Sequence, residues 1–166
     1  KGRVYKDQLD LIDPDLEHNT KYQKLMVLAD DVRKLGIRTN ADRPEDAQKA
    51  RQFGAEGIGL CRTEHMFFDP ERIKAVREMI VAENESDRRA AVMKLLPYQR
   101  EDFVALLEAM HDLPVTIRLL DPPLHEFVTL NEKQIAELAQ DLNIPAEKLA
   151  KRIESLHELN PMLGHR

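Results

Sequence analysis

The sequence has one cysteine and no tryptophan among its 166 residues. A single cysteine forms no disulfide within the chain, which favours a reducing, cytoplasmic compartment. An organelle interior such as a plastid stays open as a second location, because a transit segment is removed after import. The 25 basic and 30 acidic residues give a net charge of −5 without a basic stripe. These features argue against a nucleic-acid partner.

Long apolar runs are also missing from the sequence. No uncharged stretch approaches the roughly 20 residues that a membrane helix needs, so we expect no membrane partner. The chain begins without an initiator methionine and stops in a turn-rich segment, residues 160–166. We therefore expect it to be a piece of a larger protein. Its length suits one domain with a core of its own.

Three apolar segments predict short strands, over residues 35–40, 57–62 and 114–121. The last is the richest in β-branched side chains. Apolar residues at helical spacing predict helices between the strands and on both flanks, the first over about residues 16–34. Strands separated by helices indicate right-handed crossovers and a parallel sheet, so the fold class is α/β. Three strands make either a small open sheet or the first part of a (βα)₈ TIM barrel, preceded by a linker helix.

A few residues predict where helices begin and end. Asp42 and Glu45 have the spacing of a helix capping pair. Ser86 is a candidate cap for a helix that reaches Leu96. Proline removes a backbone hydrogen bond from a helix, so Pro97 predicts an interruption before the next helix.

Polar side chains gather where two of the predicted strands end. The second strand ends at Arg62 and is followed by Glu64, and the third carries Arg118 and Asp121. In α/β proteins, sites form at the carboxyl ends of strands. The planar fork of a guanidinium suits a phosphate or carboxylate, so the two arginines indicate an anion site, best matched by a phosphoryl group. The alternative is that each arginine only pairs with a neighbouring acid such as Glu64 or Asp121.

Other candidates at the same edge carry weaker signals. Asn40 ends the first strand and faces the same rim, or is simply a turn residue. Asp121 is a candidate to orient a guanidinium or bind substrate, or caps the following turn. His65 and His125 each follow a strand without a third ligand, so we predict no metal site. Cys61 lies within an apolar strand and is expected to be a buried small hydrophobe. No nucleotide-binding glycine loop is present.

Residues 54–68, with the sequence Gly-Ala-Glu-Gly-Ile-Gly-Leu-Cys-Arg-Thr-Glu-His-Met-Phe-Phe, closely resemble the pyruvate, phosphate dikinase family. Three more segments agree with the family in the same order: residues 38–42, 117–127 and 160–166. The resemblance implies a multidomain enzyme that interconverts ATP, pyruvate and phosphate with AMP, phosphoenolpyruvate and diphosphate through a phosphohistidine. It implies that residues 1–12 end a swivelling phosphohistidine domain, 13–34 form the linker helix, and 35–166 begin the substrate-binding barrel.

The resemblance also assigns site residues. Arg62 and Arg118 match the family's substrate-binding arginines and Arg166 matches a further one, while Asn40 and Asp121 complete our candidate set for pyruvate or phosphoenolpyruvate. The family's Mg²⁺ ligands, catalytic cysteine and carrier histidine fall outside this chain. We therefore expect no catalytic or metal-binding residue here and no activity from the isolated segment. The implied partners are the swivelling domain of the same polypeptide and, for the full-length enzyme, further copies of itself.

Three alternatives remain open beside this interpretation. The first is that the segment belongs to a related phosphoenolpyruvate synthase or to enzyme I of the sugar phosphotransferase system, which share the Gly-Ile-Gly-Leu and arginine core. The second is that it is a non-catalytic module that binds phosphate or carboxylate. The third is that it is a structural barrel segment with no binding role.

Overall fold

The computed structural model describes residues 4–6, 8–9, 18–160 and 163 of the chain. These residues divide into two compact units, 1–36 and 37–166, which we describe separately. In the described part, no helix is long and apolar enough to cross a membrane.

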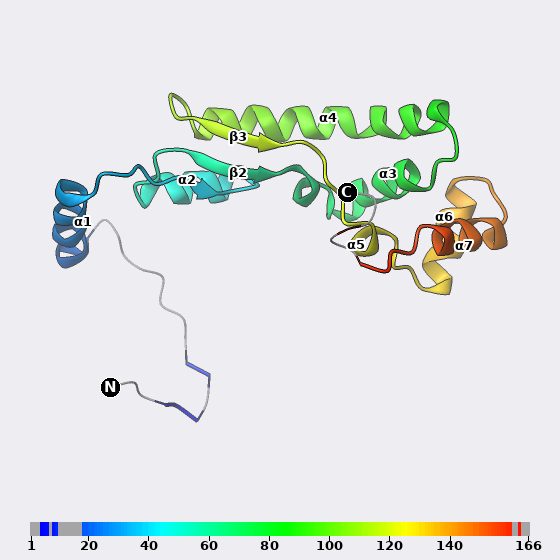
Figure 1. The fold of residues 1–166 in the computed structure, drawn as a ribbon, viewed down its shortest axis with the longest axis horizontal. Helices are drawn as coiled ribbons and strands as arrows, with labels where there is room; N and C mark the ends of the chain where they lie inside the picture. The colour runs from blue at the N-terminus through cyan, green and yellow to red at the C-terminus, as the bar shows by residue number, and fades with distance from the viewer. Residues whose placement is uncertain (1–3, 7, 10–17, 161–162, 164–166) are drawn as a thin grey trace. The chain divides into compact units, whose positions relative to one another are not determined.

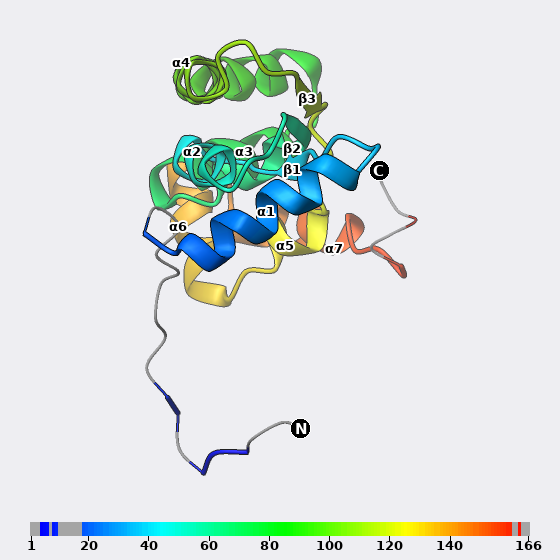
Figure 2. The same cartoon turned by 90° about the vertical axis from the view of Figure 1, so that its left-hand side faces the viewer.

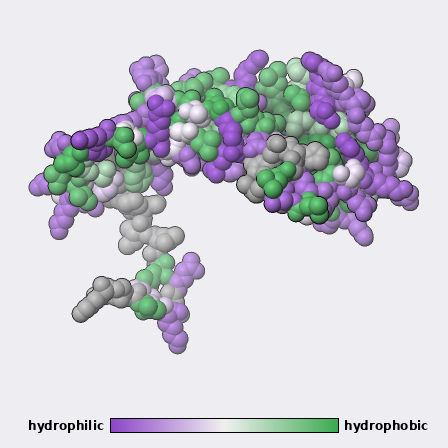
Figure 3. All heavy atoms as spheres, in the orientation of Figure 1, coloured by the Kyte–Doolittle hydropathy of each residue, from purple (hydrophilic) through white to green (hydrophobic). Residues whose placement is uncertain are grey.

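The first unit contains one helix, α1 (Thr20–Val32), in its described part. Asn19 caps the helix, because its side-chain oxygen accepts a hydrogen bond from the backbone N–H of Tyr22 at 3.1 Å. No residue of α1 is buried. Leu25 and Leu28 are 62% and 61% exposed, and apolar side chains of α1 are visible on the surface in Figure 3. The helix expected from the sequence is confirmed, with a later start than predicted.

The second unit is built on a parallel three-stranded sheet of order β1-β2-β3 (Figure 1). The strands are β1 (Thr39–Asn40), β2 (Ile58–Arg62) and β3 (Val115–Arg118). The described part of this unit also contains a 3₁₀ helix and six α-helices, which lie between and after the strands: η1 (Thr63–Phe67), α2 (Pro44–Gln52), α3 (Pro70–Val81), α4 (Glu85–Ala109), α5 (Leu124–Val128), α6 (Glu132–Asp141) and α7 (Ala146–Ser155). The predicted α/β class and parallel sheet are confirmed.

The strands are shorter than the sequence predicts. β1 lies at an edge of the sheet, and its pairing with β2 shifts register between Thr39 and Asn40. β3 pairs with β2 alone in the described part and stops at Arg118. Leu119 is 87% exposed beyond it. The predicted segment 119–121 is therefore a loop.

Helices α2 and α4 lie on the same side of the sheet and bury one of its faces (Figure 2). The core on this face contains Ile58 and Cys61 of β2, Ala47 of α2, and Leu106 of α4. Cys61 is completely buried, as predicted. Irregular pairing between Ile58 and Cys61 accompanies the burial of both side chains in the same core. A second cluster joins α3, α4, α5 and α7, and a third joins the end of α3 to α6 and α7.

The predicted interruption at Pro97 is wrong, because α4 runs through it without a break in its assignment. Leu95 is buried in the second cluster before the proline, and Leu106 is buried in the first cluster after it. We attribute the continuity to this packing on both sides, which offsets the roughly 3 kcal/mol that a proline costs inside a helix. The cap is also different from the prediction: Asn84 accepts from the backbone N–H of Asp87 at 2.9 Å, and Ser86 lies inside the helix.

Gly57 makes the close contact that starts β2 beside β3. Its φ is +155°, and a Cβ atom on it would lie 2.6 Å from the carbonyl oxygen of Pro114. The same oxygen accepts a hydrogen bond from the backbone N–H of Ile58 at 2.9 Å. The backbone of Gly57 and the carbonyl oxygen of Pro114 cannot move apart to relieve this clash without weakening the pairing of β2 with β3.

We predict that Gly57→Ala lowers the free energy of unfolding by about 1–3 kcal/mol, through the clash and the unfavourable backbone angle. Chemical denaturation followed by circular dichroism measures the change. Gly54→Ala is the matched control, because Gly54 also has a positive φ, +88°, but nothing lies within 4 Å of the added Cβ. Equal losses in the two variants would show that the contact with Pro114 is not the cause.

Candidate functional site

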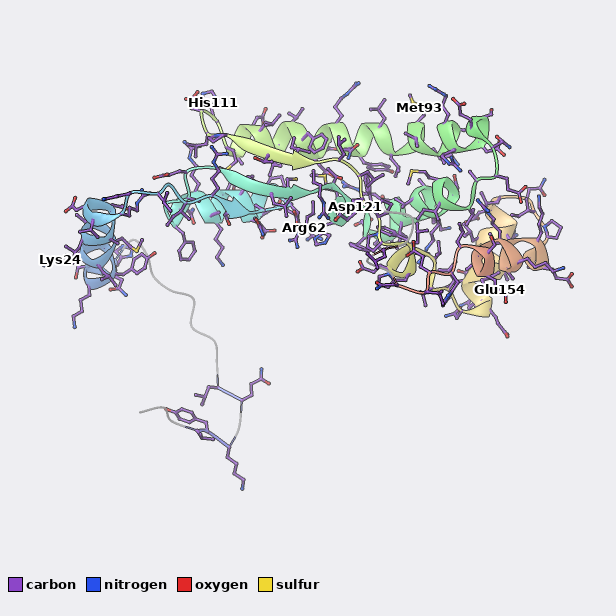
Figure 4. All side chains as sticks on the ribbon, in the orientation of Figure 1. Lys24, Arg62, Met93, His111, Asp121 and Glu154 are labelled. Carbon is purple, nitrogen blue, oxygen red and sulfur yellow. The ribbon has the colours of Figure 1, made fainter. Side chains whose placement is uncertain are left out.

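The two arginines singled out from the sequence lie side by side. Arg62 and Arg118 are direct register partners at the carboxyl ends of β2 and β3. Their side chains are 36% and 34% exposed, so each guanidinium remains partly open to solvent. Figure 4 shows where Arg62 and Asp121 lie on the fold. Pairing of parallel strands thus brings together two cations that are far apart in the sequence.

Arg62 is held by Asp42, which follows β1. Asp42 Oδ2 accepts hydrogen bonds from Arg62 Nε at 3.0 Å and from Nη2 at 2.7 Å. Its other oxygen, Oδ1, accepts from the backbone N–H of Arg62 at 2.6 Å. Burial raises the pKa of Asp42, but the hydrogen bonds from Arg62 outweigh it and hold the pKa below its usual value. Asp42 is therefore ionised at neutral pH, and the pair is a salt bridge.

His65 is a second partner of the same carboxylate. Its Nδ1 atom lies 2.9 Å from Asp42 Oδ2, the oxygen that also binds the Arg62 side chain. The ring of His65 packs at a tilt against Phe68, with 5.8 Å between the ring centroids. Phe68 in turn stacks on Phe127, with 4.8 Å between centroids. The histidine is thus part of the arginine's support. In the described part of the chain, no group of three or more metal-ligating side chains occurs.

Arg118 is held by Glu64, which follows β2. Nη2 of Arg118 donates to Glu64 Oε1 in a close ion pair. Glu64 is only 3% exposed, which is unusual for a carboxylate. Thr63 also contributes, because its hydroxyl donates to the backbone carbonyl of Arg118 at 3.2 Å. Nη1 of Arg118 lies 4.0 Å from Asp121 Oδ2.

The pairing of each arginine differs in part from the alternative considered for the sequence. Glu64 does pair with an arginine, but with Arg118 on the next strand rather than with Arg62 close by in sequence. The partner of Arg62 is Asp42, which the spacing had suggested as a helix cap. Helix α2 instead begins after Arg43 without a side-chain cap. The available signal is position: Asp42 is the second residue after β1, at the edge where β2 ends.

The remaining candidates are placed less centrally. Asp121 lies in the loop after β3, near Arg118. Asn40 ends β1, where its backbone carbonyl accepts from the Thr39 hydroxyl at 3.3 Å. Arg166 lies outside the described residues, so its role stays a prediction. His125 belongs to α5, and its Nε2 atom lies 3.9 Å from Glu126 Oε1.

Cys61 lies next to Arg62 in the sequence but is buried in the core. Burial, together with the nearby carboxylates of Asp42 and Glu64, raises the pKa of its thiol to about 11. A thiol that is both buried and protonated is a poor nucleophile. Its position indicates a structural role.

We predict that iodoacetamide alkylates native Cys61 at least about 100-fold more slowly than the unfolded chain at pH 8. A pKa moved from 9.0 to about 11 leaves about 100-fold less thiolate, and burial restricts access further. Because the chain has a single cysteine, mass spectrometry reports this site alone. In the full-length protein, Cys61→Ser should keep most turnover and lose some stability. Equal labelling rates, or a loss of activity by orders of magnitude with an intact fold, would contradict the structural role.

Comparison with known proteins gives a family to this arrangement. A family model described as the PEP-binding domain of PEP-utilising enzymes, where PEP is phosphoenolpyruvate, matches residues 17–166. The pyruvate, phosphate dikinase of Rhizobium meliloti (strain 1021) is 56% identical over 165 residues, 99% of this chain and 18% of that protein. Those of Giardia intestinalis and Clostridium symbiosum are 52% and 44% identical over the same share of this chain, which covers 18% and 19% of their lengths.

The chain therefore spans less than a fifth of the curated relatives it matches. The matched span covers nearly the whole chain, so it includes both strand ends that carry the arginines. From the family model and the fold together, we conclude that this chain belongs to the PEP-utilising enzymes and matches their PEP-binding domain.

Proposed function

We propose that Arg62 and Arg118 bind the phosphoryl group as it moves between a carrier histidine and pyruvate. The observation that carries the proposal is their register pairing at neighbouring strand ends, which directs two guanidinium groups to one rim of the sheet. A transferring phosphoryl group carries charge on several oxygens. Fixed cationic donors stabilise this charge without having to reorganise during the reaction.

The wider assignment rests on the relatives. Proteins named pyruvate, phosphate dikinase match 99% of this chain at 44–56% identity. We propose the same activity for the full-length protein, with residues 35–166 as the start of a (βα)₈ barrel and Asn40, Asp121 and Arg166 at its substrate rim. The swivelling domain that delivers the phosphoryl group belongs to this proposal, as do self-association of the full-length enzyme and its location in the cytoplasm or an organelle.

Magnesium does not fit the residues at these strand ends. The two acids best placed there, Asp42 and Glu64, are already paired with Arg62 and Arg118. We therefore propose that the Mg²⁺ ligands of the full-length enzyme lie outside this chain.

We predict that Arg62→Lys and Arg118→Lys in the full-length protein each slow phosphoryl transfer between histidine and pyruvate by about 10²–10³. Lysine keeps the charge but loses the planar fork of donors. Phosphorylation of the histidine by ATP and phosphate should proceed as in the unmodified protein, because these arginines serve only the pyruvate half. Single-turnover measurements of the two half-reactions separate the effects.

Arg72→Lys is the matched control. Arg72 also pairs with a carboxylate, with 2.5 Å between its Nη1 and Asp102 Oδ2, but it lies on α3 rather than at a strand end. Both half-reactions should survive this change. The proposed role is wrong if the pyruvate half survives in the Arg62 and Arg118 variants, or if both halves fall together. Phosphate binding without any phosphoryl transfer in the full-length protein would support the non-catalytic module instead.

A further inference from the structure

The carboxylates that hold the two arginines follow a common rule of placement. Asp42 is the second residue after the end of β1, and it holds the arginine that ends β2. Glu64 is the second residue after the end of β2, and it holds the arginine that ends β3. Each arginine is thus held by an acid from the preceding strand. Because the same placement occurs at two neighbouring strand ends, we interpret it as one repeated arrangement rather than two unrelated ion pairs.

We propose that Asp42 and Glu64 are positioning residues, which determine the donor edge that Arg62 and Arg118 present to the phosphoryl group. The inference rests on the function proposed above for the two arginines. It adds a role for two acids that touch no substrate and act only through the guanidinium groups.

The contacts of Asp42 restrict Arg62 to one orientation. Asp42 takes two donors of the guanidinium, Nε and Nη2, on the same oxygen. It also binds the arginine's own backbone N–H, so side chain and main chain are tied to one group. Nη1 makes no hydrogen bond to any residue in the described part of the chain and is the donor left for a ligand. Burial of Asp42 and its contact with His65 limit the movement of the carboxylate itself.

The hold of Glu64 on Arg118 is less complete. One oxygen of Glu64 accepts from Nη2, whereas Oε2 of Glu64 and Nε of Arg118 are buried without a partner among the described residues. Guanidinium–carboxylate pairs commonly form two parallel hydrogen bonds. Polar atoms that are buried and unpaired are costly, and native proteins contain few of them. Glu64 therefore holds Arg118 by a single hydrogen bond.

The competing explanation is that both acids are ordinary structural partners. The same unit contains such a pair, Arg72 with Asp102, whose side chains are 21% and 19% exposed. Removing either kind of pair lowers stability. Only a positioning role predicts that the loss of activity is confined to the half-reaction that uses Arg62 and Arg118.

The first experiment compares Asp42→Asn and Glu64→Gln with the control Asp102→Asn in the full-length protein. We expect each of the first two to slow the pyruvate half-reaction by about 10–100-fold, by analogy with the loss of a residue that orients a metal ligand. The loss should appear in kcat more than in KM, because an arginine held in the wrong orientation still binds charge but matches the transition state poorly. Histidine phosphorylation should keep its rate in all three variants, and Asp102→Asn should keep both rates.

The second experiment is a double-mutant cycle on the same half-reaction. If Asp42 acts only through Arg62, Asp42→Asn adds no further loss to Arg62→Lys. When Asp42→Asn is combined with Arg118→Lys, the loss of rate should instead be the product of the two single losses. Glu64→Gln should show the reverse pattern, with no added loss on Arg118→Lys.

Several results would overturn the inference. The first is an unchanged rate of the pyruvate half-reaction in Asp42→Asn and Glu64→Gln. The second is an equal loss of rate in Asp102→Asn. The third is a double variant of an acid and its own arginine whose loss of rate is the product of the two single losses. If Asp42→Asn does not fold, Asp42→Glu keeps the charge and moves it by one methylene, and a loss confined to the pyruvate half is again expected. A normal pyruvate half-reaction in Arg62→Lys itself would overturn the proposed function, whereas slow Arg62→Lys beside normal Asp42→Asn would overturn only the positioning role.

Discussion

The pairing of β2 with a parallel strand on each side is the constraint on which the rest of the site depends. Parallel strands deliver their carboxyl ends to the same edge of a sheet. Arg62 and Arg118 consequently become neighbours although they are 56 positions apart in the sequence. Helices α2 and α4 stabilise the pairing from one face, where Ile58 and Cys61 are buried. Strand β2 thus contributes both to the core and to the charged rim.

Charge balance at this rim is largely internal. Two arginines face two buried or nearly buried acids, so the paired groups add little net charge to the sheet edge. If the arginines bind a phosphoryl group as we propose, they would offer it oriented hydrogen-bond donors rather than a strong positive field. Such a site would select for geometry, which suits a tetrahedral phosphoryl group better than an arbitrary anion.

Much of the fold could be predicted from the sequence, because apolar spacing reports local structure directly. The sequence predicts strand β2 and its terminal Arg62 to within one residue. It does not predict the partner of Arg62, because Asp42 is twenty positions away and its spacing to Glu45 also fits a local cap. The interruption expected at Pro97 is wrong for a related reason: the rule for proline describes an isolated helix, whereas α4 is held by contacts on both sides. Long-range contacts decided both cases.

Helix α4 joins two of the three cores of its unit. Leu95 lies in the cluster with α3, α5 and α7, while Leu106 lies in the cluster beneath the sheet. Its 25 residues correspond to a length of about 37 Å. Because one continuous helix packs in both clusters, we expect the two clusters to unfold cooperatively. The strand ends that carry the arginines are therefore stabilised in part by the packing of α4 against α3, α5 and α7.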